Sequence, residues 1–253
     1  MALRISNLTK YYRKHLAVDN VSFNVGDGEI VGLLGPNGAG KTTILRCVTG
    51  IIQATSGTVE VEGLSLREKE SEAKRRLAFV PEAPNPYDML TVLEHMRFIA
   101  MAYDTVDVFN QRADALLERF DLTEQRNDLV LTLSKGMKQK LAVVCAFIHN
   151  AGCLLFDEPL IGIDPRGVRE LKDMMLEAKS DGRSLLISTH MLDTAEKLCD
   201  RIIILRRGRL VAEGSLEELH QRAKMGEDAS LEDVFLNLTE GETDSEGSGV
   251  SSL

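Results

Sequence analysis

One run of residues has the types and spacing that phosphate binding needs: Gly35-Pro36-Asn37-Gly38-Ala39-Gly40-Lys41-Thr42-Thr43. It fits the pattern G-x-x-x-x-G-K-[ST] and lies between a predicted strand and a predicted helix, as that motif requires. Its glycines allow successive backbone N–H groups to point at phosphate oxygens, and the helix adds its positive N-terminal end. Lys41 supplies a point charge to the terminal phosphates, and Thr42 can place a hydroxyl on Mg²⁺. A glycine turn with a chance lysine is the plainer alternative, and the flanking strand and helix argue against it.

Two adjacent acids, Asp157 and Glu158, follow four apolar or cysteine residues at 153–156. That pattern predicts a buried strand whose carboxyl end presents carboxylates, at the edge where open α/β sheets hold ligands. Asp157 suits support of Mg²⁺ and its waters, and Glu158 is a candidate general base for an attacking water. A strand that ends in Asp-Glu is commonly just a solvated strand end. The upstream phosphate-binding motif favours the catalytic interpretation.

Apolar residues mark the strands that must position these groups. Alternating apolar positions at 3–8 and 21–25 predict two strands that open the chain as an antiparallel unit. Runs that are apolar on both faces, typical of buried central strands, follow at 29–34, 77–80, 153–156, 184–188 and 202–205. Helical segments such as 166–180 separate most of these runs. We therefore expect an α/β fold with a mainly parallel sheet.

Strand signals disappear between residues 91 and 129, where two amphipathic helical stretches, 91–101 and 107–120, take their place. We expect a helical subdomain inserted at about 84–150 within one domain over 1–238. An apolar helix face formed by Leu231, Val234, Phe235 and Leu238 closes that domain. Residues 239–253 are acidic and rich in Ser and Gly, so we expect a disordered tail.

The composition restricts the class of partner and the compartment. The chain has 253 residues with 30 Lys and Arg against 39 Asp and Glu, a net charge of −9, which argues against a nucleic-acid binder. No apolar run reaches the roughly 18 residues of a membrane span, and the first residues lack a secretory signal, so we expect a cytoplasmic protein. The four cysteines are far apart, and we expect them to be small buried hydrophobic residues.

These motifs, in this order, resemble the nucleotide-binding subunits of ABC transporters over nearly the whole chain, residues 3–238. Residues 133–137, Leu-Ser-Lys-Gly-Met, resemble the family's signature sequence, usually Leu-Ser-Gly-Gly-Gln, and retain Ser134 and Gly136. From the residues alone, a helix N-cap is the simpler interpretation of Ser134. The resemblance implies instead that Ser134 and Gly136 contact the γ-phosphate held by a second subunit. It also implies a P-loop NTPase core.

Three further positions take their roles from the resemblance. Tyr12 occupies the aromatic position that stacks on adenine, although the adjacent Tyr11 could serve by stacking alone. Residues 160–165 resemble the D-loop at the dimer interface, and Asp164 matches its acid. His190 follows a predicted buried strand and matches the switch histidine, which contacts the γ-phosphate and positions the attacking water. The resemblance therefore makes Lys41, Glu158 and His190 the catalytic set.

The sequence departs from the family pattern at several positions. Glu82 stands where the family usually has Gln, in the loop that touches both Mg²⁺ and the membrane partner. A carboxylate can still accept from a metal-bound water, but it adds negative charge beside the triphosphate. Lys135 and Met137 replace the usual Gly and Gln of the signature. These departures, with the segment 230–235, resemble a bacterial exporter branch.

The resemblance implies a Mg²⁺-dependent ATPase that uses ATP to pair with a second ATP-binding subunit, identical or related. The pair would drive a separate transmembrane permease and be held by it at the cytoplasmic face of the cell membrane. Expected metal ligands are Thr42, Glu82 and Asp157. A soluble, non-transport ATPase of the same architecture is the alternative, but the paired domains or long coiled coils of such relatives are not evident here. A small-molecule P-loop kinase would have no use for the signature motif.

Overall fold

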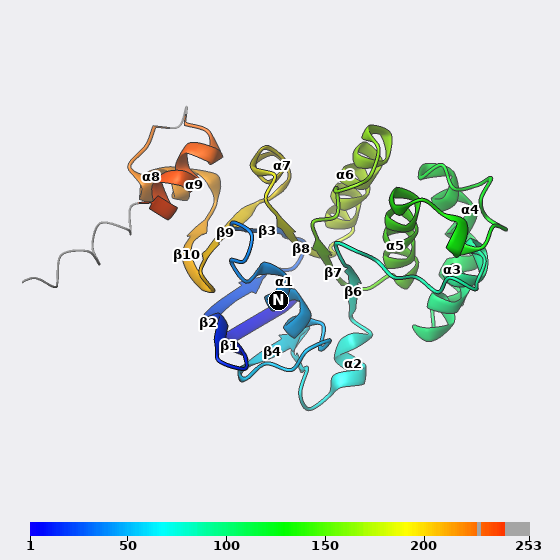
Figure 1. Ribbon diagram of the computed structural model, residues 1–253, viewed down its shortest axis with the longest axis horizontal. Helices are drawn as coiled ribbons and strands as arrows, with labels where there is room; N and C mark the ends of the chain where they lie inside the picture. Colours follow the sequence, from blue (N-terminus) through cyan, green and yellow to red (C-terminus); the bar gives the residue numbers. More distant parts are fainter. Residues whose placement is uncertain (227–228, 241–253) are drawn as a thin grey trace, which may run out of the picture.

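The computed structural model describes residues 1–226 and 229–240, and it contains two sheets with helices around them (Figure 1). The smaller, four-stranded sheet is antiparallel and has the order β2-β1-β4-β5. Its strands are β1 (Leu3–Tyr12), β2 (His15–Val25), β4 (Ser56–Val61) and β5 (Leu64–Ser65). The predicted antiparallel unit is confirmed. Strand β4 was not predicted, because its first three residues are small or polar and exposed.

The larger sheet has six strands in the order β10-β9-β3-β8-β7-β6. These strands are β3 (Ile30–Leu34), β6 (Leu77–Val80), β7 (Cys153–Asp157), β8 (Ser184–Thr189), β9 (Arg201–Arg206) and β10 (Arg209–Gly214). All neighbours are parallel except β9 and β10. Every residue of β3, β7 and β8 is buried, which explains why these strands read as continuous apolar runs. The mainly parallel α/β sheet is therefore confirmed.

Helices cover the larger sheet and flank the smaller one. They are α1 (Lys41–Val48), α2 (Glu70–Lys74), α6 (Pro165–Ser180), α7 (Leu192–Leu198), α8 (Leu216–Ala223) and α9 (Leu231–Glu240). Leu45 of α1 joins the apolar core between the two sheets, whereas Leu171 and Met175 of α6 join the core on the other side of the larger sheet. Because α1 directly follows β3, the loop between them lies at the carboxyl edge of the sheet.

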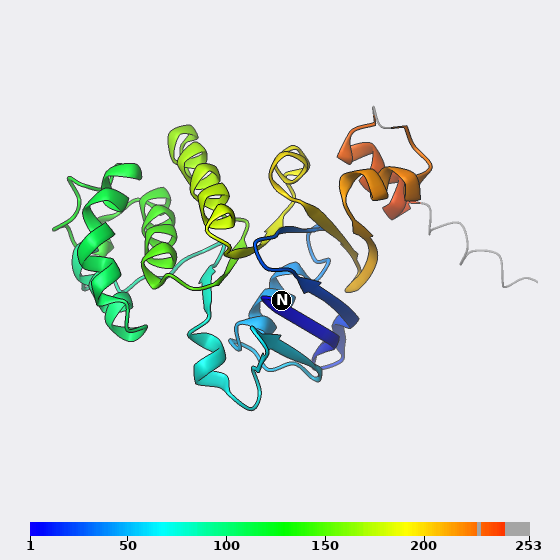
Figure 2. The same cartoon turned by 180° about the vertical axis from the view of Figure 1, so that it is seen from behind.

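The remaining helices form a group at one end of the molecule, seen in both views (Figure 1, Figure 2). They are α3 (Val92–Ala102), α4 (Val106–Arg119), the short 3₁₀ helix η1 (Val130–Thr132) and α5 (Lys135–His149), all within residues 84–150. Helix α3 begins with a capping box in which Thr91 and Glu94 exchange side-chain-to-backbone hydrogen bonds. Its Met96 is fully buried and belongs to the same core as Leu117 of α4 and Leu141 of α5. This shared core makes the three helices one packed unit.

The last described helix, α9, extends two residues into the segment 239–253 that we predicted as tail. Thr239 is buried, and its hydroxyl donates to the Phe235 carbonyl at 2.7 Å. Arg206 of β9 donates to the Thr239 carbonyl and so satisfies an acceptor at the helix end. The predicted boundary at 239 thus falls two residues before the end of α9, and the Arg206 contact is the tertiary interaction at that end. The rest of the predicted tail, 241–253, lies outside the described residues.

Within the described ranges, no helix combines the length and apolarity that crossing a bilayer requires.

Candidate nucleotide-binding site

The loop between β3 and α1 has the backbone geometry of an anion cradle. Gly40 has φ 105° and ψ 0°, in the left-handed region that favours glycine. A Cβ at this position would lie 2.8 Å from the Ala17 carbonyl oxygen, so close packing also requires glycine. No side chain caps α1, and the N–H groups of its first turn are therefore free for an anionic ligand.

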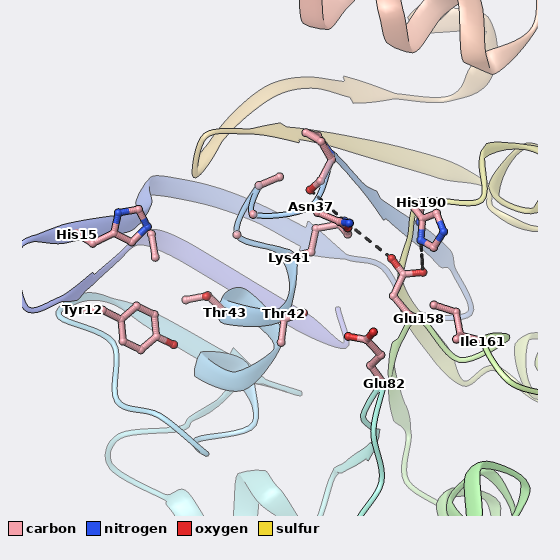
Figure 3. Close-up of a pocket in the computed structure, with 15 residues that line it drawn as sticks. Tyr12, His15, Asn37, Lys41, Thr42, Thr43, Glu82, Glu158, Ile161 and His190 are labelled. Atoms are coloured by element: carbon pink, nitrogen blue, oxygen red, sulfur yellow. Dashed lines mark hydrogen bonds and ion pairs between the residues drawn. The ribbon is translucent and has the colours of Figure 1, made fainter. Parts of the chain in front are cut away.

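Lys41 projects from the first turn of α1 into the base of this cradle (Figure 3). Its Nζ donates to the Gly35 carbonyl at 2.6 Å and lies 3.9 Å from Oε1 of Glu158. Burial lowers the pKa of Lys41, and the nearby carboxylates of Glu158, Asp157 and Glu82 oppose that shift. A buried cation held among carbonyl oxygens is well placed to bind the terminal phosphates of a nucleotide.

Glu158 lies immediately after β7 in an unusual backbone conformation. Its φ is 48°, rare for a residue other than glycine, and its N–H donates to the Ser188 carbonyl at 2.9 Å. The side chain reaches His190, whose Nδ1 lies 2.9 Å from Oε2 (Figure 3). Lys41, Glu158 and His190 thus form a continuous polar chain across three elements of the sheet edge. A carboxylate in this position can accept a proton from a water beside the phosphates.

Asp157, the last residue of β7, shows whether the site could hold a metal ion. It is 1% exposed, and its Oδ1 has no hydrogen-bond partner among the described residues. Its register partner on β8, Ser188, has a buried hydroxyl that is likewise unpartnered. A buried carboxylate oxygen without a donor fits a hard cation or its water. The hydroxyl of Thr42 and the carboxylate of Glu82, which line the adjoining pocket, are ligands of the same type.

A pocket of about 460 Å³ brings most of the predicted site together. It is lined by Tyr12, Glu82, Glu158, His190 and every loop residue from Pro36 to Thr43. Gly35 lies behind the lining, where its carbonyl accepts from Lys41. Of the two tyrosines, Tyr12 lines the pocket and Tyr11 does not.

Three lining residues were given no individual role from the sequence: His15, Ala17 and Ile161. His15 begins β2, three positions after Tyr12 in the same hairpin, and that proximity was the available signal. Ile161 follows Glu158 by three residues, in the loop that leaves β7. Ala17 has no polar side-chain atom, so no side-chain signal could identify it, although its carbonyl oxygen lies close to Gly40.

The signature residues lie outside this pocket. Ser134 is exposed and caps α5, with its Oγ accepting from the Met137 N–H at 3.2 Å. Gly136 contacts the D-loop of the same chain, since a Cβ there would meet the Gly162 carbonyl oxygen at 2.5 Å. Both interpretations of Ser134 therefore remain compatible: the hydroxyl caps its helix and also faces outward.

Asp164 is also outside the pocket, at the N-cap of α6, where it accepts from the Gly167 N–H at 3.3 Å. It forms an ion pair with Lys140 of α5, and a hydrogen bond from that lysine is the main cause of its lowered pKa. The pair links the signature helix to the D-loop within one chain. Lys140 was not singled out from the sequence, because its partner is 24 residues away and only the fold brings them together.

A glycine-rich cradle before α1, acids at the end of β7, a histidine after β8 and an inserted helical unit together define an ATP-binding cassette with ATPase activity. Comparison with known proteins agrees. The family model described as "ABC transporter" matches residues 18–161, and the chain belongs to this family. Its relative in Bacillus subtilis (strain 168), "ABC-type transporter ATP-binding protein EcsA", is 38% identical over 238 residues, which cover 94% of this chain and 96% of that protein.

Solved structures show the same architecture. One, described as "Structure of ATP binding subunit of ABC transporter", superposes with a TM-score of 0.91 at 35% identity and covers 94% of this chain and 100% of that chain. A dimeric ATP-binding cassette in a post-hydrolysis state, bound to ADP and Pi, has a TM-score of 0.76 at 25% identity, covering 84% of this chain and 98% of that one. The chain thus has the fold of cassettes that bind adenine nucleotides and dimerise.

Proposed function

We propose that this chain is the Mg²⁺-dependent ATPase subunit of an ABC exporter, acting with a second ATP-binding subunit and a separate membrane permease. The observation that carries the proposal is the chain of contacts from Lys41 through Glu158 to His190 at the carboxyl edge of the sheet. The three groups stand at one pocket with the phosphate cradle. That is the arrangement that hydrolysis of a terminal phosphate requires.

Each group has a distinct role in this proposal. The cradle N–H groups and Lys41 bind the phosphates, while Tyr12 stacks on adenine. Glu158 accepts a proton from the attacking water, and His190 holds that carboxylate through its Nδ1 contact and faces the γ-phosphate. Asp157, Thr42 and Glu82 would hold Mg²⁺ directly or through water. The metal would neutralise charge on the β- and γ-phosphate oxygens.

The catalytic unit in this proposal is a dimer. Ser134 and Gly136 do not line the pocket of their own chain, and Ser134 is exposed at the N-terminus of α5. A second subunit could therefore present its signature to the triphosphate bound here, with its D-loop, including Asp164, at the interface. ATP would bridge the two subunits, and loss of the γ-phosphate would loosen them.

The permease would dock near Glu82 and the helical insert. The exposed large apolar side chains of the insert include Tyr87 (58%), Met89 (78%), Phe98 (43%) and Met101 (62%). The rings of Tyr87 and Phe98 pack edge to face with centroids 5.1 Å apart. Exposed aromatic and methionine side chains of this kind are enriched at protein–protein interfaces. The permease would hold the subunit at the cytoplasmic face of the membrane.

The proposed direction of transport is export. It rests on the resemblance of Glu82, the signature and residues 230–235 to exporter subunits.

A complementation experiment tests the composite site. Lys41→Ala should disable the cradle, and Ser134→Asp should disable the signature by placing a carboxylate against the phosphates. Asp is as good an N-cap as Ser, so α5 keeps its cap in the second variant. Each variant alone should be nearly inactive. An equimolar mixture should recover about a quarter of wild-type ATPase activity, because half of the dimers are mixed and each has one intact site.

Two controls make the result decisive. Mixing Lys41→Ala with Glu158→Gln, both defects of the cradle side, should recover nothing, since no mixed dimer then has an intact cradle with its partner's signature. Denaturation midpoints of all variants should match the wild type, which excludes misfolding as the cause of inactivity. Full activity of Ser134→Asp alone would refute a role for the signature, and absence of recovery in the first mixture would refute the shared site.

A further inference from the structure

A second cavity, of about 240 Å³, lies between the helical insert and α6. Helices α4, α5 and α6 stand side by side in both views (Figure 1, Figure 2). The cavity shares no lining residue with the nucleotide pocket. It adjoins Arg183, just before β8, whereas the nucleotide pocket adjoins His190, just after β8. The two cavities are thus at opposite ends of the same strand.

Arg183 is the unusual residue of this cavity. Its side chain is 12% exposed, and its Nη1 is buried with no hydrogen-bond partner among residues 1–226 and 229–240. The nearest carboxylate oxygen, on Asp181, is 3.8 Å from Nη2, beyond hydrogen-bond distance. Burial lowers the pKa of Arg183, so the charged form lacks full compensation. A buried donor on a charged group without a partner is uncommon in folded proteins and points to a missing acceptor.

The other charged groups of the lining leave room for such an acceptor. Arg119 is already paired, donating to both oxygens of Glu177 at 2.8 and 3.0 Å. Arg112 is exposed and forms no ion pair with any other described residue. Nη1 of Arg183 and the guanidinium of Arg112 therefore remain available to an anion. Two exposed acids of the lining oppose it: Asp181, 3.8 Å from Nη2 of Arg183, and Glu177, which is already paired with Arg119.

The remaining lining is apolar. Ala115 and Leu116 come from α4, Phe147 from α5 and Met174 from α6. The Arg183 guanidinium lies 5.4 Å from the centre of the Phe147 ring, which is a cation–π contact. The two side chains therefore line the cavity next to each other. The volume equals about eight water molecules, at about 30 Å³ each, which limits the occupant to a small molecule.

We propose that this cavity binds a small carboxylate anion with an apolar body, its carboxylate at Arg183 and its body against Phe147 and Met174. A carboxylate supplies the acceptor that Nη1 lacks and neutralises the free charge. An apolar body suits the rest of the lining better than water does. The occupant would touch both the helical insert and α6, the two parts that the cavity separates.

Titration with benzoate, followed by amide chemical shifts of the full chain, tests the proposal. Saturable shifts should appear at residues of α4, α5 and α6 and not at Gly38. Acetate, which has no apolar body, and benzamide, which has no charge, should each bind at least about tenfold more weakly. Shifts that do not saturate, or equal binding of benzamide, would overturn the proposal.

Variants locate the contact. Arg183→Met should weaken benzoate binding about tenfold or more by removing the charge-assisted hydrogen bond. The matched control Arg209→Met removes a surface arginine paired with Asp19 on the other side of the molecule and should leave the affinity unchanged. Should Arg183→Met fail to fold, Arg112→Met, at an exposed position, should still weaken binding about two- to fivefold. Unchanged affinity in a folded Arg183→Met, or in Arg112→Met if that variant must replace it, would refute the site.

Discussion

The phosphate half and the signature half of this cassette are organised differently. In the phosphate half, Lys41, Glu158 and His190 already meet in one pocket, although they come from α1 and the ends of β7 and β8. In the signature half, Ser134 and Gly136 are satisfied by their own chain: one caps α5, and the other packs on Gly162. One chain thus contains a preassembled group of polar side chains at a pocket and, elsewhere, signature residues whose contacts are made within their own chain.

Under the proposed function, this difference would let one chain be stable on its own while its turnover depends on a second subunit. The sheet edge must hold charged groups close together, so burial and mutual contacts fix them before any ligand arrives. The signature holds no charged groups close together within one chain. Its residues instead cap α5 and pack against the D-loop. Variants in the phosphate half should therefore affect the chemical step. Variants in the signature half should affect helix capping and contacts with a second subunit.

The largest effect is expected for Glu158→Gln. The amide cannot accept a proton from water, so the ATPase rate should fall by about 100- to 10,000-fold. ATP binding should persist, and dimers should accumulate in size-exclusion chromatography with ATP. Glu60→Gln, at a half-buried residue that does not line the pocket, is the matched control and should change neither quantity. Full turnover of Glu158→Gln would remove this residue from its proposed role.

Lys41→Ala should reduce the ATPase rate by about 100- to 1,000-fold, through loss of the charge that faces the developing phosphate charge. Unlike Glu158→Gln, it should also weaken ATP binding in a fluorescence titration, since the lysine contacts the nucleotide before reaction. Lys69→Ala, at an exposed residue paired with Glu72, is the control. Unchanged kinetics would contradict the cradle assignment.

On the signature side, Ser134→Ala should lower the free energy of unfolding by about 1 kcal/mol, the usual value of an N-cap. Chemical denaturation without nucleotide measures this within a single chain. Ser134→Asp should retain the stability, because Asp also caps, yet it should lose activity. If the two variants have equal stability, Ser134 contributes little as a cap, and the contrast between the halves is weaker than we infer.

The smallest effect concerns Lys140→Met. The lysine lowers the pKa of Asp164, so in the variant that pKa should return towards the ordinary value of 3.8. A carboxylate with a lowered folded pKa stabilises the protein above its ordinary pKa, and that contribution is lost as pH falls through the lowered value. The variant should therefore lose the contribution at neutral pH and depend less on pH below 3.8. NMR titration of the Asp164 carboxyl measures the shift, with Lys138→Met as control. An unaltered pKa would mean that the α5–α6 link is not electrostatic.

Local sequence predicted the elements with strong and continuous signals. Strand β7 reads as four apolar or cysteine residues before two acids, and residues 35–42 satisfy an eight-residue pattern, so both were identified with their neighbours. Strand β4 was missed, because three exposed small or polar residues open it. The end of α9 was misplaced, because the contact between Arg206 and Thr239 joins residues 33 positions apart.

The sequence by itself determined which groups can bind phosphate, accept a proton and hold a cation, since residue type and short spacing set the local backbone and its donors. Only the tertiary structure decided that His190 meets Glu158, that Lys140 meets Asp164 and that Arg183 faces a cavity with an unpartnered nitrogen. Those contacts depend on strand order and helix packing. They arise from the burial of apolar surface over the whole chain, which no short segment specifies.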